Sequence, residues 1–337
     1  MANWQLATGS WQLTLEPNYS IVIPAYNESA RLGATLDKVL AYMRTQGCNA
    51  EVIVVNDGSR DNTLQILKNN SSRCSFISQP QAGAAVARNR AIQMSNNPFV
   101  AFLDADDEWL PAKLEHQIKI LENDSTLGLV CSRCSVSELR IHRYAGPVPR
   151  GMPNSGKLFA YLVRDCFIYT PTVVVRRACL EDVGLFNESL AVSEDFNLWL
   201  RIAARWNICF LPDVLAITHK RSGSLSSSIT AETRLHTGVR SLQDVQLRCR
   251  DLTSAEARAL RNALAQRIYF YGAHLLLTGA ASRSRPQFLT ALKLRPTLWR
   301  ALAKLVLSFL PTRLCNSLAD WKSHAFHRAP TRLGSSP

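Results

Sequence analysis

The chain has 337 residues, of which 47% are hydrophobic, and its formal net charge is +13. This length and composition exclude a chain that is disordered throughout and allow two folded units. The charge is uneven, because residues 246–337 hold 15 Lys or Arg and 3 Asp or Glu, a net charge of +12, whereas residues 1–245 hold 24 and 23. The basic C-terminal part therefore needs an explanation of its own.

The first part of the chain alternates between strand-like and helix-like apolar patterns. Residues 1–18 have no clear period, and we interpret them as an N-terminal extension. Strands are predicted at residues 20–24, 51–56, 74–78 and 99–103, with helices at residues 29–45, 60–68, 83–94 and 111–121. Further along, strands are predicted at residues 128–136, 172–175 and 208–211 and a helix at residues 194–204. This alternation predicts an α/β fold of Rossmann-like type, in which helices cover both faces of a mostly parallel sheet.

Acidic residues follow two of the predicted strands. Asp57 comes after the strand at residues 51–56, and Asp104 and Asp106 come after the most apolar strand, at residues 99–103. The carboxyl ends of parallel strands form the ligand-binding edge of such a sheet, so we expect these carboxylates on one rim. Close carboxylates repel each other unless a cation or a polar ligand offsets their charge, and Mg²⁺ and Mn²⁺ prefer oxygen ligands. The alternatives are a solvated acidic turn at Asp104 and Asp106 and ordinary turn chemistry around Asp57.

Side chains suited to a nucleotide follow the first predicted strand and lie on the small-residue helix at residues 83–94. Tyr26 is suited to stack on a base, and Glu28 to accept hydrogen bonds from ribose hydroxyls. The alternative is a helix cap at Asn27 with Glu28 in the first turn. Arg88 supplies a fixed cation for nucleotide contact, or it is a surface arginine on a packed helix.

An acidic pair opens the predicted helix at residues 194–204. Asp195 is a candidate general base, and Glu194 beside it would disfavour ionisation of Asp195 and so raise its basicity. The alternative is that both acids favour the positive N-terminus of the helix. Trp199, one turn further on, is predicted to belong to the core.

Five stretches in order resemble the family 2 glycosyltransferases. They read YSIVIPAYNE (19–28), VIVVNDGSRDNT (52–63), AGAAVARN (82–89), FLDADDEW (102–109) and EDFNLWLR (194–201). Members of this family have the GT-A fold and invert the configuration at the anomeric carbon. The resemblance implies a GT-A catalytic domain at residues 19–230, followed by a basic helical C-terminal region at residues 231–337.

The resemblance also implies roles for individual residues. Contacts to a nucleotide-diphosphate sugar would come from Pro24, Tyr26, Glu28, Asp57, Arg88 and Asp104. Asp104 and Asp106 would hold a divalent metal, Mn²⁺ or Mg²⁺, on the donor diphosphate, and Asp195 would be the catalytic base. The family often has Arg-x-His before a Ser-rich turn, whereas this chain has His219 and Arg221 in the reverse order. Either of them could reach the diphosphate, and the alternative is a solvated basic loop.

The implied function is the inverting, metal-assisted transfer of a sugar from a nucleotide-diphosphate sugar to a hydroxyl of a glycan or lipid-linked acceptor. The product would be a bacterial-type surface glycan. The alternative is a non-catalytic nucleotide-sugar-binding or scaffold protein on the same fold, although the intact Asp104, Asp106 and Asp195 favour the enzyme. A sugar nucleotidyltransferase is a third interpretation, but the glycine-rich N-terminal loop expected for it is absent.

The basic C-terminal region has two amphipathic patterns. Residues 255–277 place Leu260, Leu264, Ile268, Tyr271 and Leu275 on one helical face. Residues 296–310 place Leu298, Trp299, Leu302, Leu305, Val306 and Phe309 within one arc, opposite Arg300 and Lys304. A basic amphipathic helix with tryptophan at its apolar edge is typical of an anionic membrane surface. The alternative is a helix packed on the catalytic domain or on a dimer partner. Nucleic acid is disfavoured, because no binding module accompanies the charge.

The cysteines and the N-terminus bear on the compartment. Nine cysteines are scattered without a secreted-type framework, and Cys131 and Cys134 are interpreted as buried free thiols. These features indicate a reducing compartment. No signal-peptide pattern is present, and no apolar run reaches the ~18 residues that a membrane span needs. We therefore expect a cytoplasmic protein, or one bound peripherally to the inner face of the membrane.

Overall fold

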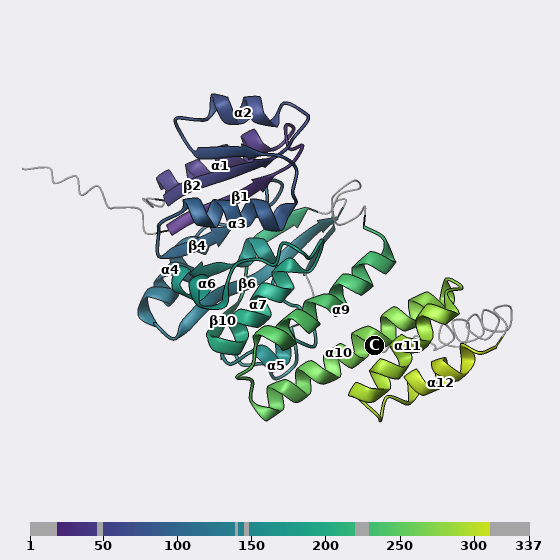
Figure 1. The fold of residues 1–337 in the computed structure, drawn as a ribbon. Coiled ribbons are helices and arrows are strands. Elements are labelled where there is room, and N and C mark those ends of the chain that lie inside the picture. The colour runs from purple at the N-terminus through teal and green to yellow at the C-terminus, as the bar shows by residue number, and fades with distance from the viewer. Residues whose placement is uncertain (1–18, 46–49, 139–140, 145–147, 220–228, 311–337) are drawn as a thin grey trace, which may run out of the picture.

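The computed structural model describes residues 19–45, 50–138, 141–144, 148–219 and 229–310 (Figure 1). The strands are β1 (Tyr19–Ala25), β2 (Ala50–Asp57), β3 (Ser75–Gln79), β4 (Phe99–Phe102), β5 (Glu108–Trp109), β6 (Leu127–Glu138), β7 (Ile141–Tyr144), β8 (Ser155–Gly156), β9 (Val174–Arg176) and β10 (Asn207–His219). The helices are α1 (Leu32–Thr45), α2 (Thr63–Asn69), α3 (Ala84–Met94), α4 (Lys113–Asn123), α5 (Phe159–Leu162), α6 (Arg177–Val183), α7 (Glu194–Arg205), α9 (Ala231–Arg248), α10 (Ser254–Leu277), α11 (Ala281–Leu294) and α12 (Trp299–Leu307).

All the described strands belong to one sheet, which is covered on both faces. Its order is β3-β2-β1-β4-β9-β6-β10-β5, with β7 beside β6 and β8 beside β10. Alternate residues of β1 enter different cores, because Ile21 and Ile23 pack with Leu36 of α1 whereas Val22 packs with Ala87 of α3. Strands that are apolar on both faces need helices on both faces, and this explains why β1 and β2 read as continuous apolar runs. The predicted α/β architecture is confirmed.

The direction of the strands changes in the middle of the sheet. Strands β3, β2, β1 and β4 run parallel, and β6 and β10 are also parallel, but β9 is antiparallel to both β4 and β6. The strand predicted at residues 172–175 is divided into a 3₁₀ turn at Thr170–Thr172 and β9. Pro171 lacks a backbone N–H and favours such a turn over a ladder position. The β9 strand comes from later in the chain and lies between β4 and β6, which therefore run in the same direction as each other.

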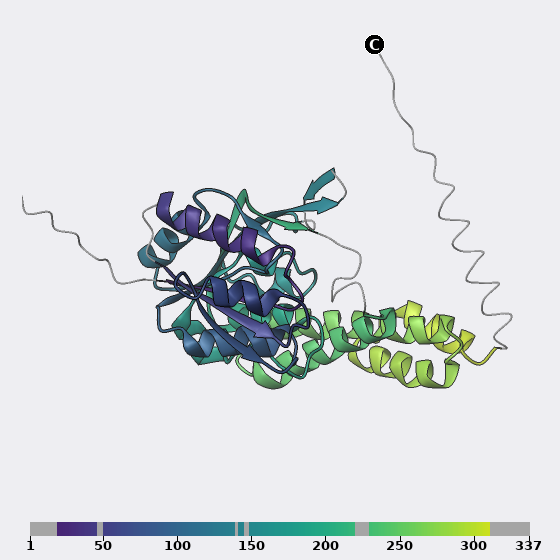
Figure 2. The ribbon, with the colours of Figure 1, turned by 90° about the horizontal axis from the view of Figure 1, so that it is seen from above.

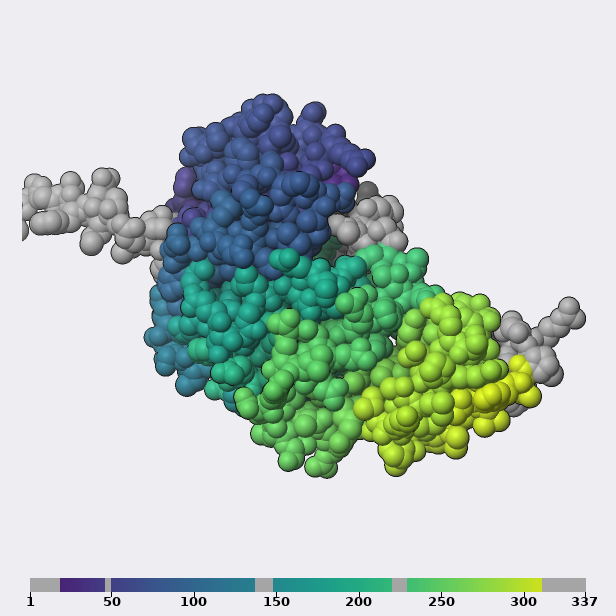
Figure 3. Space-filling model, viewed as in Figure 1, coloured from purple at the N-terminus to yellow at the C-terminus, as the bar shows by residue number. Residues whose placement is uncertain are grey.

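The C-terminal helices share a core with the part of the chain that forms the sheet. The five residues predicted to form one face of α10 are all buried, and they belong to the same hydrophobic cluster as Leu198 of α7 and Leu129 of β6. The α11 and α12 helices form a lobe that extends away from the sheet (Figures 1 and 3). The domain boundary near residue 230 stays a prediction, since the core is continuous across it. Among the described helices, none is both long and apolar enough to cross a membrane.

The cysteines in the described residues carry free thiols, and Cys131 and Cys134 are buried, as predicted. Burial raises the pKa of the Cys134 thiol to about 11, so this side chain is not a reactive thiolate.

Gly58, in the turn after β2, has the clearest requirement for glycine. Its φ is +74°, and a Cβ built there would lie 2.5 Å from the backbone nitrogen of Gln81. Gly151 has a φ of +73° but no atom within 4 Å of its built Cβ, which makes it a matched control. We expect Gly151→Ala to lower the free energy of unfolding by about 1–2 kcal/mol. Gly58→Ala should cost a further 1–3 kcal/mol or so for overpacking. Urea unfolding of both variants measures the difference. Equal decreases in the free energy of unfolding would show that the turn at Gly58 shifts to accommodate the methyl group.

Candidate active site

The loops after β1 and β2 are tied together by hydrogen bonds between their backbones and side chains. The N–H of Asn27 donates to Ser59 Oγ at 2.9 Å, and the N–H of Arg60 donates to Asn27 Oδ1 at 2.8 Å. Asn27 has a left-handed backbone, with a φ of 55°, and α1 begins only at Leu32. The alternative that Asn27 caps a helix is therefore wrong, because its side chain closes the neighbouring loop. Tyr26, half-buried, lies on this fixed segment.

Asp61 and Thr63 complete this connection, and sequence reasoning gave them no role. The N–H of Glu28 donates to Thr63 Oγ1 at 2.8 Å, and the N–H of Ser29 donates to Asp61 Oδ2 at 3.0 Å. Desolvation alone would raise the pKa of Asp61, but hydrogen bonds from Thr63 and Ser29 hold it well below its ordinary value. The sequence did offer one indication of this role, because Asp61 and Thr63 follow soon after Gly58 at the strand end. Short polar side chains in such loops favour hydrogen bonds to nearby backbone groups.

Asp57 is buried at the end of β2 and holds the segment that leads into α3. Its carboxylate accepts hydrogen bonds from Gln79 Nε2 at 2.7 Å and from the N–H groups of Ala82 and Gly83, both at 2.8 Å. Turn chemistry is thus part of its role. Contact with a nucleobase stays a prediction.

The carboxylates after β4 form a cluster with Glu28. Burial, followed by the charges of Asp104 and Glu28, raises the pKa of Asp106 to about 7. Burial and the charges of Asp104 and Asp106 likewise raise the pKa of Asp107. In the described residues, no three His, Cys, Asp or Glu side chains are arranged to hold a metal ion. The cluster nevertheless offers oxygen donors whose mutual repulsion a divalent cation would offset.

Arg88 joins this cluster to the start of α7. Its guanidinium contacts Asp104 Oδ1 at 2.7 Å and Glu194 Oε1 at 2.9 Å, and its side chain is only 7% exposed. The alternative of a surface arginine is therefore wrong. Burial alone would lower the pKa of Arg88, but Asp104 and Glu194 raise it above the usual value, so the group stays charged. Contact between Arg88 and a nucleotide stays a prediction.

Asp195 is the second residue of α7 and lies beside Glu194. Its Oδ1 accepts the N–H of Phe196 at 2.6 Å, and its Oδ2 accepts the hydroxyl of Thr170 at 3.2 Å. Its pKa is raised from 3.8, mainly by burial and further by Asp104. Sequence reasoning named Glu194 as the cause, but the charge of Asp195 instead raises the pKa of Glu194, after burial. A raised pKa gives Asp195 the basicity that proton abstraction needs.

The turn that carries Thr170 is fixed by hydrogen bonds from side chains for which the sequence predicted no role. Trp109 Nε1 donates to the carbonyl of Pro171 at 2.8 Å, and Gln117 Nε2 donates to that of Thr172 at 2.8 Å. Lys113, fully buried, donates to Gln117 Oε1 at 2.7 Å, and burial lowers its pKa to about 7. These bonds position Thr170 against Asp195.

Trp199 is fully buried and packs against Phe102 and Phe186, so its prediction as a core residue is confirmed. His219 ends β10, which continues well beyond the predicted strand at residues 208–211, and its N–H donates to Asp107 Oδ1 at 3.2 Å. This bond brings His219, half-buried, to the acidic cluster. Arg221 lies outside the described residues.

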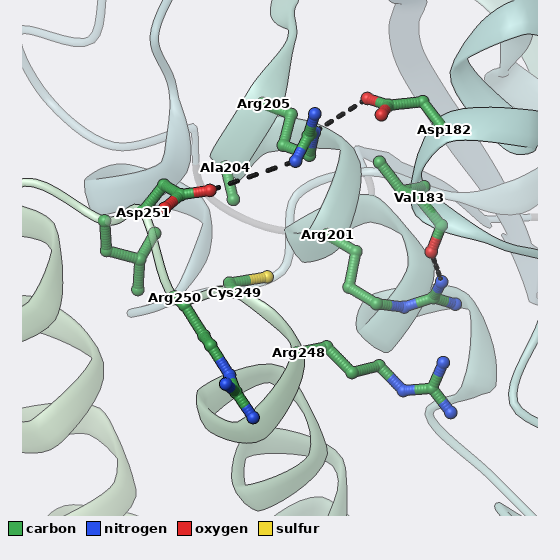
Figure 4. Close-up of a pocket in the computed structure, with 10 residues that line it drawn as sticks. Asp182, Val183, Arg201, Ala204, Arg205, Arg248, Cys249, Arg250 and Asp251 are labelled. Carbon is green, nitrogen blue, oxygen red and sulfur yellow. Dashed lines mark hydrogen bonds and ion pairs between the residues drawn. The ribbon is translucent and has the colours of Figure 1, made fainter.

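A small pocket of about 100 Å³ opens near the last turn of α7, the opposite end from Asp195 (Figure 4). Two of its arginines already have partners: Arg205 pairs with Asp182 at 2.7 Å, and Arg201 donates to the carbonyl of Gly184 at 3.0 Å. The pocket is separate from the carboxylate rim and adds nothing to it.

The fold and the rim define the class of protein. A mixed, mostly parallel sheet with helices on both faces and carboxylates at its strand ends is the GT-A fold of glycosyltransferases. The sequence model described as "Glycosyl transferase family 2" matches residues 20–184. The chain belongs to this family. The match ends before Asp195 and His219, so their roles stay predictions.

Two relatives and one solved structure illustrate the similarity. An uncharacterized glycosyltransferase of Rickettsia bellii is 31% identical over 196 residues, 58% of this chain and 27% of its own length. The Escherichia coli UDP-Glc:alpha-D-GlcNAc-diphosphoundecaprenol beta-1,3-glucosyltransferase WfgD is 31% identical over 191 residues, 56% of this chain and 71% of its own. The S. aureus TarS structure with UDP-GlcNAc has a TM-score of 0.65 and 20% identity, covering 90% of this chain and 92% of TarS. The chain spans 27%, 64% and 63% of the lengths of the first three Rickettsia relatives it matches.

Proposed function

We propose that this protein transfers a sugar from a nucleotide-diphosphate sugar to an acceptor hydroxyl, with inversion at the anomeric carbon. The observation that carries the proposal is the Arg88 bridge. One guanidinium contacts Asp104 on the rim and Glu194, the neighbour of Asp195, which are far apart in sequence. Arg88 thereby connects Asp104, which is suited to the donor diphosphate, to the start of α7, where Asp195 is suited to the acceptor.

Asp195 is the proposed base. It removes the proton of the acceptor hydroxyl as that oxygen attacks the anomeric carbon, and a positioned base contributes ~10²–10⁴ in rate. The leaving diphosphate departs on the opposite side of the sugar, which inverts the configuration. The hydroxyl of Thr170 and the N–H of Phe196 orient the carboxylate for this step.

The nucleotide is proposed to bind along the tied loops after β1 and β2. Tyr26 would stack on the base, Glu28 would accept hydrogen bonds from ribose hydroxyls, and Asp57 would accept one from a base N–H. Pro24, near the end of β1, lies just before these loops and would also contact the nucleotide. His219, with Arg221 beyond it, would contact the diphosphate. The hydrogen bonds between the two loops support this role, since a preorganised site loses less entropy on binding.

Asp104 and Asp106 would hold Mn²⁺ or Mg²⁺ on the donor diphosphate. Such an ion supplies Lewis-acid stabilisation of the leaving group's charge. The residues fit such an ion, because Asp104 and Asp106 offer hard oxygen donors. Burial, followed by the charges of Asp104 and Glu28, raises the pKa of Asp106 to about 7, and a divalent cation would offset that repulsion.

Metal binding can be measured without turnover. We expect Mn²⁺ together with a nucleoside diphosphate to raise the Tm, by the equivalent of about 2.7 kcal/mol at a hundredfold excess over the Kd. Asp106→Asn should abolish most of this shift, because it removes one proposed ligand charge. Asp213→Asn, at an exposed position on β10, is the matched control and should keep the full shift. Equal shifts in both variants would remove Asp106 from the metal site.

The acceptor is proposed to be lipid-linked, within surface-polysaccharide biosynthesis at the cytoplasmic face of a membrane. Support comes from WfgD, whose name specifies a diphosphoundecaprenol-linked acceptor and a UDP-Glc donor. A panel of nucleotide sugars, scored for release of nucleoside diphosphate with Mn²⁺ and lipid-linked acceptors, tests the function. Tight donor binding without turnover of any member would favour a non-catalytic nucleotide-sugar-binding protein instead.

A further inference from the structure

The α12 helix has two apolar faces, and only one of them is packed. Leu298, Ala301 and Leu305 face the hydrophobic core. The other face is open: Trp299 is 64% exposed, Leu302 53%, Val306 61% and Phe309, just after the helix, 66%. The predicted arc is therefore divided between packing and solvent. The packed half lies against α11. The alternative that this helix is packed therefore holds for one of its apolar faces and not for the other.

The hairpin that carries this open face has charged residues of a single sign. Residues 281–310, which form the α11–α12 hairpin, contain six Lys or Arg and no Asp or Glu, and one of the six, Arg283, pairs with Glu232 of α9. Arg300 lies 5.6 Å from the ring centroid of Trp299, and Arg285 lies 4.2 Å from that of Phe309. Cations next to exposed aromatic rings are typical of side chains that work at a lipid headgroup boundary.

The hairpin is also placed to bring the catalytic rim to a surface. In both ribbon views the chain enters β1 on the left and the α11–α12 lobe lies on the right (Figures 1 and 2). Strands β1, β2 and β4 run parallel, so their carboxyl ends, which carry the rim residues, point toward the side of the lobe. The lobe and the rim therefore lie toward the same side of the molecule.

We propose that the open face of α12 docks on an anionic lipid bilayer. Trp299, Leu302, Val306 and Phe309 enter the headgroup region, and the basic side chains of the hairpin contact lipid phosphates. A second copy of the chain is a poorer occupant, because a symmetric contact would oppose two faces that carry only positive charge. The same argument disfavours residues 311–337, which hold four Lys or Arg and one Asp.

Flotation of the full chain with vesicles tests this without donor or acceptor, so it is independent of the transfer reaction. The native chain should bind phosphatidylcholine vesicles that contain phosphatidylglycerol and should not bind pure phosphatidylcholine. For the triple variant Trp299→Ser, Leu302→Ser, Phe309→Ser, the lipid concentration that binds half of the protein should rise at least about tenfold. Lys293→Gln and Arg300→Gln should each weaken binding about fivefold.

Leu247→Ser is the matched control, because Leu247 is 72% exposed on α9, outside the hairpin, and it should leave vesicle binding unchanged. The substituted side chains are exposed, so thermal melts should stay near the native Tm. The proposal is overturned if the native chain does not bind the anionic vesicles, or if the triple variant binds like the native chain. Light scattering adds a third outcome: a native dimer that the triple variant dissociates, without loss of vesicle binding, would make this face a contact between copies.

Discussion

Asp195→Asn should lower kcat by about 10²–10⁴-fold while leaving the Km for the nucleotide sugar within a few-fold of the native value. The amide has nearly the same shape, and its oxygen still accepts the N–H of Phe196. What it loses is the ability to take a proton. Steady-state assays at saturating donor measure the change, and circular dichroism with thermal melts checks the fold. Native turnover in this variant would refute the base assignment.

The pH profile gives a second measure of the same group. Because the pKa of Asp195 is raised from 3.8, kcat should rise with pH through an apparent pKa above that value, as the carboxyl loses its proton. The Thr170 hydroxyl bond lowers the pKa of Asp195, so Thr170→Val should move the rise to higher pH and cost far less in kcat than Asp195→Asn. An unmoved profile in Thr170→Val would assign the rise to another group.

Arg88→Met should be the most destabilising single change at the site. It leaves Asp104 and Glu194 without their shared cation, and loss of one partner of a buried pair costs about 3–5 kcal/mol. Arg205→Met is the matched control, because Arg205 also contacts two carboxylates, Asp182 at 2.7 Å and Asp251 at 3.9 Å, but its side chain is 53% exposed. We expect about 0–1 kcal/mol there. Denaturant unfolding of both variants measures the contrast.

Two further variants separate the charge of Arg88 from its geometry. Arg88→Lys keeps one positive charge but not the planar fork that reaches both carboxylates, so we expect an intermediate loss of stability. In a Glu194→Gln background, Arg88→Met should cost less than it does in the native chain, because one of the two stranded charges is gone. Identical costs in the two backgrounds would mean that the ion pair with Glu194 contributes nothing to stability.

The helices and strands of the first half of the chain could be predicted because their patterns are local. Strand β4 and helix α7 depend on the apolar spacing of their own residues, and their predicted positions agree with the structure to within a residue or so. The predictions were weaker where a distant contact decides the outcome. The strand predicted at residues 172–175 begins only at Val174, because the turn that contains Pro171 extends to Thr172. The β10 strand extends to His219 because it pairs with β6 along its length.

The site residues divide in the same way. Asp104, Asp106 and Asp195 could be proposed as site residues from the sequence because they lie in stretches that resemble the family 2 glycosyltransferases. Thr170, Asp61 and Gln117 could not, since a hydroxyl, an acid and an amide have no local pattern that names their partners. Their importance comes from bonds to residues tens of positions away.

The sequence by itself determined the α/β class, the family, the acidic residues of the rim and the basic character of the C-terminal region, because these depend on residue type and local spacing. Only the tertiary structure decided that Arg88 joins Asp104 to Glu194, that burial is the main cause of the raised pKa of Asp195, and that α12 packs one apolar edge and exposes the other. Each of these findings depends on which groups the fold brings into contact and which groups it buries. Contact and burial cannot be deduced from the order of residues along the chain alone.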